Sequence, residues 1–149
     1  MPVYLNVPGV TGDVATDPYY GWIELQSASW ASGSLKQQNE IVCTKFTDSS
    51  SNALYGLSIN GSGKDMAIAF VKDGQEYMRL EMKGVLISGF SMSSSKNNDR
   101  PMETVTLNYQ SIEYKYVKKD ETATSVNGTT DDYSYQVCYP DGGYSTLEE

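Results

Sequence analysis

Apolar and polar residues alternate along much of this chain, and the longest alternating stretch covers residues 103–117. A period of two indicates a half-buried β-strand. Two apolar sets of opposite parity occur within the stretch, namely Val105, Leu107 and Tyr109, then Ile112, Tyr114 and Tyr116. The parity changes near Gln110, and one extra residue exchanges the two faces of a strand. We therefore expect a single long central strand that bends or bulges there, in a curved sheet or barrel.

The same pattern predicts further strands, which lie at residues 3–7, 21–30, 41–46, 66–70, 77–88 and 133–139. Asp73-Gly74 separates two of them and is typical of a hairpin turn. Gly84 interrupts the second strand of that hairpin and predicts a bulge or a corner.

Residues 48–60 give the one helix pattern in the sequence. Ala53, Leu54 and Leu57 form a narrow apolar stripe at helical spacing. Asp48 or one of the serines after it is expected to cap the first turn. Asn60-Gly61 is expected to end the helix in a left-handed conformation.

Seven or eight strands and one short helix predict a mainly β fold. The two architectures consistent with this count are an antiparallel β-barrel and a two-sheet sandwich, with the helix on one side. A length of 149 residues predicts a single domain over 1–149. The last residues, 143–149, look like a frayed end.

Charge and composition exclude several functions. A net charge of -8 argues against nucleic acid and anionic membranes, which require clustered Lys and Arg. The chain has no histidine, so the commonest general base and metal ligand are missing. Cys43 and Cys138 lack the spacing of a zinc site or redox motif, so free thiols are favoured and a disulfide stays open. No signal peptide or membrane span is recognisable, which predicts synthesis in the cytoplasm.

No group of residues predicts catalysis, a metal or a cofactor. The acidic pairs Asp131-Asp132 and Glu148-Glu149 read as solvated charge. Gly61-Ser62-Gly63-Lys64 lacks the spacing of a phosphate-binding loop and follows the predicted helix instead of preceding one. We expect a protein that is not an enzyme.

Several segments, in order along residues 3–140, resemble one family. They are Val7-Pro8-Gly9 with Gly12-Asp13, Gly21-Trp22-Ile23-Glu24, Ser27-Ala28-Ser29-Trp30, Thr44 to Ser50, Gly63-Lys64, Ala67 to Gly74, Glu76-Tyr77-Met78, Val85 to Ser91, Glu103 to Tyr109, Ile112-Glu113-Tyr114 and Tyr133 to Tyr139. On these residues the chain resembles the hemolysin-coregulated protein family, the inner-tube subunits of bacterial type VI secretion.

The resemblance implies a barrel-like, phage tail-tube-like subunit that forms hexameric rings. It also implies that the rings stack into a tube, with a contractile sheath around it, a spike at its tip and small effector proteins in its lumen. Export would then proceed without a signal peptide, through the type VI apparatus. Three alternatives are a monomeric barrel that binds a small ligand, a tube protein of a related phage-tail-like injector, and, least favoured, a hydrolase that uses carboxylates or a serine.

The resemblance also directs attention to possible subunit contacts. The loops Ala31–Glu40 and Lys118–Asp132 are expected at the ring faces, and the first of them is shorter than the glycine-rich loop common in the family. Segments Ser27–Trp30 and Tyr109–Tyr116 are expected near subunit contacts. The individual interface residues predicted are Ser27, Ser29, Trp30, Ser34, Gln37, Tyr109, Glu113, Lys115, Lys118 and Lys119.

Two further expectations concern charge and the tryptophans. Stacking of acidic rings requires local matching of carboxylates with the available cations, which are Lys45, Lys64, Lys72, Arg79, Lys83, Arg100, Lys115, Lys118 and Lys119. If Trp22 or Trp30 is buried, its replacement by alanine should cost about 3–5 kcal/mol.

Overall fold

The computed structural model describes residues 2–30, 40–97, 99–118, 132–138 and 144–148, with side chains described as far as residue 116. The strands and the helix of this part of the chain are β1 (Val3–Asn6), β2 (Ile23–Leu25), β3 (Ser27–Trp30), β4 (Glu40–Phe46), α1 (Ser51–Asn60), β5 (Lys64–Lys72), β6 (Gln75–Ser93), β7 (Met102–Asn108), β8 (Ser111–Lys118), β9 (Asp132–Cys138) and β10 (Tyr144–Glu148).

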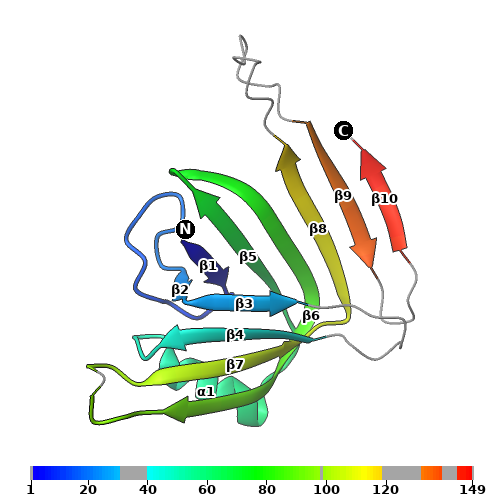
Figure 1. Cartoon of the computed structure of the whole chain (residues 1–149). Helices are drawn as coiled ribbons and strands as arrows, with labels where there is room; N and C mark the ends of the chain where they lie inside the picture. Colours follow the sequence, from blue (N-terminus) through cyan, green and yellow to red (C-terminus); the bar gives the residue numbers. More distant parts are fainter. Residues whose placement is uncertain (1, 31–39, 98, 119–131, 139–143, 149) are drawn as a thin grey trace.

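The strands form two antiparallel sheets that share β6 (Figure 1). The large sheet has the order β10-β9-β8-β6-β5-β1-β2. The small sheet consists of β3, β4, β7 and the second part of β6, residues 86–93. The first part of β6 pairs with β5 and β8, whereas residues 86–93 pair with β7. The helix α1 lies beneath the small sheet and contacts β6 (Figure 1).

The mainly β class with one short helix is confirmed, and the two-sheet form of the prediction describes the fold. The ladder is interrupted at Gln26, which separates β2 of the large sheet from β3 of the small one. The Gln26 N–H donates to the Thr44 carbonyl at 2.7 Å where the chain crosses between the sheets. The expected single strand over 21–30 is for this reason two strands. Among the described strands β2 pairs with β1 alone, so the barrel is not closed here.

Apolar side chains of both sheets fill the space between them, because alternate residues of each strand point inward. Inward residues of both sheets and Leu54 of α1 form one buried cluster, whose members include Leu5, Ile23, Ile41, Cys43, Ile68, Leu80, Met82, Val105, Leu107 and Ile112. Cys43 is fully buried, and burial raises the pKa of its thiol to about 12. This cysteine is therefore protonated and shielded from reagents at neutral pH.

The long central strand expected over 103–117 is wrong. The chain forms β7 and β8 there, separated by Tyr109 and Gln110, and the Gln110 N–H donates to the Lys83 carbonyl at 2.9 Å. The two strands belong to different sheets, and a change of parity keeps the apolar residues of both facing the core. The strand that does run through both sheets is β6, which bends at Gly84 with φ of 62°. Gly84 is the corner that the sequence predicts.

One hairpin turn and the end of the chain complete the comparison. Asp73 and Gly74 both have positive φ, 52° and 77°, so the hairpin turn between β5 and β6 is confirmed. Where a frayed end was expected, residues 144–148 form β10 and pair with β9.

The helix α1 begins at Ser51 and ends at Asn60 without the left-handed stop that was expected. Gly61 is extended, with φ of -86° and ψ of 151°. A Cβ on Gly61 would lie 2.4 Å from the Leu57 carbonyl oxygen, so the end of the helix needs glycine because of a close approach. At the other end, Asp48 accepts hydrogen bonds from Ser50, its backbone N–H among them.

Alanine at the two glycines of this region is expected to have opposite effects. Gly56 is in the middle of α1, and a Cβ added there would have no atom within 4 Å, so Gly56→Ala should raise the free energy of unfolding by about 0.5–1 kcal/mol. Gly61→Ala should lower it by about 1–3 kcal/mol, because the backbone at Leu57 must move. Urea titrations of both variants test this. Equal shifts in the same direction would contradict it.

Candidate assembly surface

The outer face of the small sheet is almost without charge. Its exposed and half-buried side chains include Ser27 and Ser29 of β3, Glu40, Val42, Thr44 and Phe46 of β4, Met102, Thr104, Thr106 and Asn108 of β7, and Leu86, Ser91 and Ser93 of β6. Among these outward positions Glu40 is the one ionisable residue. Hydroxyl groups of neighbouring strands meet on this face, as between Ser27 and Thr44 at 2.5 Å. We call this surface the hydroxyl face.

Each long side of the small sheet ends in a strand with a free edge. Within the described residues, β3 pairs with β4 alone, and residues 86–93 of β6 pair with β7 alone. Unpaired edges expose backbone N–H and C=O groups to another chain.

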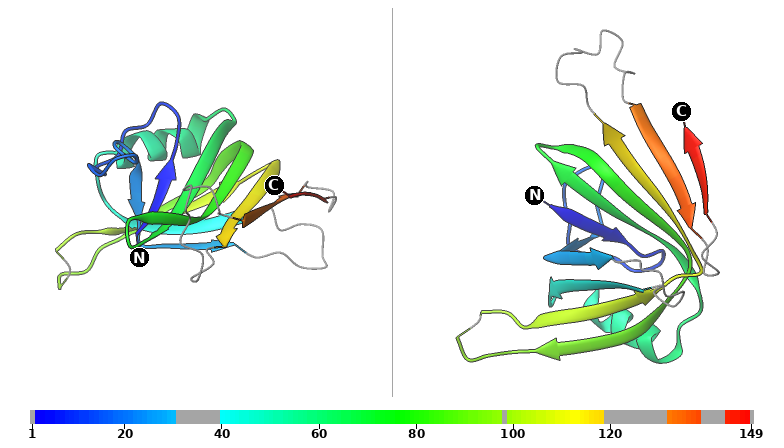
Figure 2. Two further views of the ribbon diagram at one scale, coloured as in Figure 1. Left: turned by 90° about the horizontal axis from the view of Figure 1, so that it is seen from above. Right: turned by 45° about the vertical axis from the view of Figure 1, so that its right-hand side comes forward.

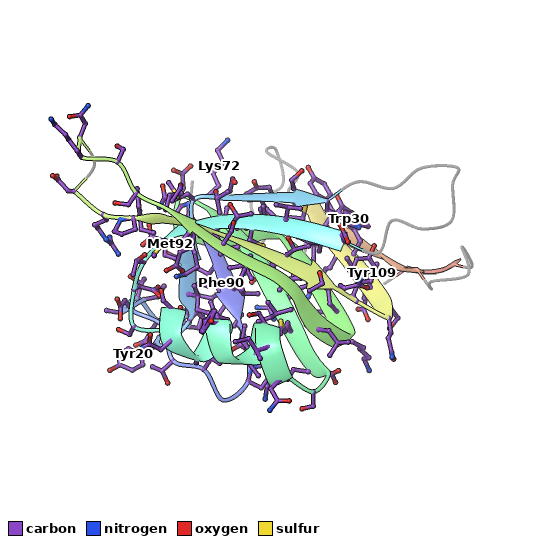
Figure 3. The ribbon with its side chains drawn as sticks, turned by 90° about the horizontal axis from the view of Figure 1, so that it is seen from below. Tyr20, Trp30, Lys72, Phe90, Met92 and Tyr109 are labelled. Atoms are coloured by element: carbon purple, nitrogen blue, oxygen red, sulfur yellow. The ribbon has the colours of Figure 1, made fainter. Side chains whose placement is uncertain are left out.

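Trp30 and Tyr109 meet on the inner side, where the small sheet approaches β8. The Trp30 Nε1–H donates to the Tyr109 hydroxyl at 2.9 Å, and the Trp30 ring stacks on Tyr114 with centroids 5.7 Å apart. Tyr109 is buried, Trp30 and Tyr114 are half-buried, and Tyr116 on the same parity of β8 is 44% exposed. Figure 3 shows Trp30 and Tyr109 close together, away from Phe90 and Met92.

The structure thus brings some predicted interface residues together and separates others. Ser27 and Ser29 lie on the hydroxyl face, whereas Trp30 and Tyr109 lie on the opposite, inner side of the small sheet. Glu113 and Lys115 are on the outer face of the large sheet, paired in register with Glu81 and Arg79. Lys118 is the last residue of β8, and Ser34, Gln37, Lys119 and most of the two predicted ring-face loops lie outside the described residues.

A buried ion cluster fixes the start of α1 to the small sheet. Lys45, with no exposed surface, donates from Nζ to Glu103 Oε1 at 2.8 Å and lies 2.9 Å from Asp48 Oδ1. It also donates to the Ser51 hydroxyl at 3.2 Å, and Thr47 donates to the second oxygen of Glu103 at 2.8 Å. Lys45 is therefore buried and is not available as a surface cation for ring stacking. The two carboxylates that converge here, those of Asp48 and Glu103, bind a lysine and do not line an open pocket.

Arg79 is also engaged within the subunit. Its guanidinium donates to both oxygens of Glu76, at 3.0 and 2.8 Å, and lies 5.5 Å from the centroid of the Trp22 ring. These hydrogen bonds raise the pKa of Arg79, against a smaller opposing effect of burial. Burial, followed by its own hydrogen bond to Glu76, raises the pKa of Tyr19 to about 12. The group fastens the 11–22 loop to the large sheet.

Other kinds of site find little support in the described part of the chain. No three His, Cys, Asp or Glu side chains among the described residues are grouped to hold a metal ion. No helix there has the length and apolar character to cross a membrane. An open hollow beside the β6–β7 connection is lined by Phe46, Asn97, Asp99, Arg100 and Met102, and Arg100 lies 5.1 Å from the centroid of the Phe46 ring.

Two antiparallel sheets around one core, with edges that no described strand pairs with and an outer face that is almost without charge, fit a structural subunit of the phage tail-tube type, the class that the resemblance implies. Residues 4–116 match the family model described as "Type VI secretion system effector, Hcp". Because the match covers most of the chain, this protein belongs to the Hcp family, the hemolysin-coregulated proteins that its sequence resembles. It is a subunit of the type VI secretion inner tube, and the family is secreted through that system.

Solved structures share the fold at low sequence identity. One called "Structure of a type six secretion system protein" is 19% identical with a TM-score of 0.81, covering 97% of this chain and 99% of that one. Hcp1 from Salmonella typhimurium is 17% identical with a TM-score of 0.78 and the same coverage. A type VI secretion system effector from Yersinia pestis is 15% identical with a TM-score of 0.74, covering 99% and 98%. None of the curated proteins compared with the chain matches it.

Proposed function

We propose that six copies of this chain form a ring whose channel is lined by the hydroxyl face, and that rings stack into a tube. The observation that carries the proposal is the position of this almost uncharged face between two sheet edges that no described strand pairs with. A single contact between unlike surfaces closes a ring when it is repeated around an axis.

The direction of the strands favours edge-to-edge joining. The small sheet has four strands, each antiparallel to its neighbour, so its two edge strands run in opposite directions. When copies stand side by side with the same orientation, β3 of one copy meets residues 86–93 of the next in an antiparallel sense. The alternation then continues around the ring without a break, and both free edges become paired.

The lining suits passage and carriage of other proteins. Hydroxyl groups and small side chains give many weak hydrogen-bonding positions, while the near absence of charge avoids strong binding of any one sign. We infer that small effector proteins occupy the channel, that a sheath surrounds the tube and a spike caps it, and that the chain performs no chemistry. It would be made in the cytoplasm and leave through the apparatus.

Stacking has an electrostatic cost. Six copies with a net charge of -8 each carry 6 × -8 = -48. Matching contacts at the ring faces, which we expect in the loops Ala31–Glu40 and Lys118–Asp132, must offset this repulsion. The strength of ring stacking is therefore expected to depend on salt concentration, because screening shortens the range of both attraction and repulsion.

Ring formation is tested by light scattering after size exclusion, with negative-stain images. The expected species is an annulus of six times 16.4 kDa. Ser91→Lys places a long cation on the free part of β6 and should shift rings towards monomers. Ser95→Lys lies beyond β6 and is the matched control, expected to leave rings intact. A wild-type protein that stays monomeric at high concentration contradicts the proposal.

A further inference from the structure

We propose that an uncharged surface of α1 and β6 on one copy packs against an aromatic surface of the next copy. The first, the helix-edge surface, consists of Tyr55, Ile59, Phe90 and Met92. The second, the aromatic surface, consists of Trp30, Tyr114 and Tyr116. The inference rests on the ring proposed above and assigns a second layer of contacts behind the paired edges.

The helix-edge surface comes from the two segments of the fold that avoid charge. Residues 49–63 and 84–95 contain no Asp, Glu, Lys or Arg, although these residues make up 20% of the chain. Six of the ten residues of α1 are exposed, and none of the ten is charged. A helix that faces water normally carries charges on its outer side, whereas the centres of protein interfaces are depleted of them.

The apolar side chains of this surface are exposed next to a free strand. Tyr55 is 56%, Ile59 67% and Met92 61% exposed. The Tyr55 ring contacts Phe90 edge to face with centroids 5.9 Å apart, which places this flank of α1 beside β6. Figure 3 shows Phe90 between the small sheet and the helix. The surface therefore adjoins the edge of residues 86–93 with which no described strand pairs.

The aromatic surface lies beside the opposite edge of the same sheet. Trp30 is the last residue of β3, and it stacks on Tyr114 of β8. The large sheet continues past the small sheet through β8, β9 and β10 (Figure 2). On β8, Tyr114 and the exposed Tyr116 share the parity of the buried Ile112, so they point to the side of the large sheet that faces the small one.

The register gives the offset between the two surfaces along the strands. Trp30 pairs with Ile41, Ile41 with Leu107 and Leu107 with Ile87. The Trp30 end of β3 is thus level with Ile87, three residues or roughly 10 Å along β6 from Phe90, the residue that Tyr55 contacts. Edge pairing between copies with a stagger of that size would bring the aromatic surface of one copy over Tyr55 and Ile59 of the next. Because one chain carries both halves on opposite edges, a second copy is the occupant that fits.

Cysteine cross-linking tests the contact. Tyr55→Cys and Tyr116→Cys are combined in a Cys138→Ser background, while the buried Cys43 stays silent. A short bis-maleimide should then join neighbouring copies into a ladder on denaturing gels. Ala53→Cys with Tyr116→Cys is the matched control, because Ala53 is exposed on the same helix but roughly 200° around its axis from Tyr55. That pair should give no ladder.

A second measurement does not depend on cysteine. Tyr55→Lys should shift the ring-to-monomer midpoint to at least tenfold higher protein concentration, whereas Ala53→Lys should leave it unchanged, with both variants folded by circular dichroism. If wild-type rings form while the Tyr55 pair fails to cross-link and Tyr55→Lys assembles normally, the helix-edge surface serves another partner, such as the sheath, and the inference is wrong while the ring stands. If wild-type protein forms no rings, both proposals fail.

Discussion

Replacing Lys45 with methionine is expected to lower the free energy of unfolding by about 3–5 kcal/mol, because it leaves buried carboxylates without their cation. Lys45 is fully buried, and Glu103 has 1% of its side chain exposed. Asp48, with 6% exposed, loses the same partner. A loss of this size is a large part of the stability of an ordinary domain, about 5–15 kcal/mol. Urea denaturation followed by far-UV circular dichroism measures it.

Two controls separate this effect from a general loss of charge. Lys83→Met removes an exposed cation from β6 and should change stability by less than about 0.5 kcal/mol. Adding Glu103→Met to Lys45→Met removes one of the stranded carboxylates and should recover part of the loss. Oligomeric state must be matched between variants, since assembly adds to apparent stability. A Lys45→Met protein as stable as wild type would show that the cluster does not hold α1 to the sheet.

The second large effect is expected at Trp30. Trp30→Ala should cost about 2–3 kcal/mol, below the 3–5 kcal/mol of a fully buried aromatic residue, because the side chain is half-buried. The variant loses the hydrogen bond to Tyr109 and the stacking on Tyr114 together. Chemical denaturation followed by circular dichroism gives the value.

Trp30→Phe separates the two contributions. It keeps a ring for Tyr114 to stack on but has no N–H to donate to Tyr109, so it should cost about 1 kcal/mol. Equal losses for both variants would mean that stacking contributes nothing. A loss near zero for Trp30→Ala would mean that the junction between β3 and β8 is not part of the stable structure.

The sequence was informative where structure follows from local pattern. Alternation located most strands, and the Asp73-Gly74 turn and the corner at Gly84 follow from the conformations that these residues favour. It did not predict features that depend on which strands pair. A parity change near Gln110 is compatible with a bulge or with two strands, and the choice depends on β6 supplying partners on both sides.

The residues of the candidate assembly surface were likewise predictable from local pattern but not in their contacts. Trp30 and Tyr109 were both expected near subunit contacts, yet they are 79 residues apart and nothing local indicates that they touch. Lys45 could have been recognised as buried, because it follows Ile41 and Cys43 on the same parity of one strand. Glu103 likewise precedes Val105 and Leu107, but only the register of β4 with β7 shows that the two charges face each other.

The continuous path of β6 through both sheets has a consequence for how the subunit comes apart. Its first part completes the large sheet, its last part completes the small one, and the strand turns the corner at Gly84 without an intervening loop. Amide protons in the two sheets should therefore become accessible to deuterium in one concerted opening, not in two. In the tube that we propose, each subunit should therefore open as one unit, because neither sheet is complete without β6.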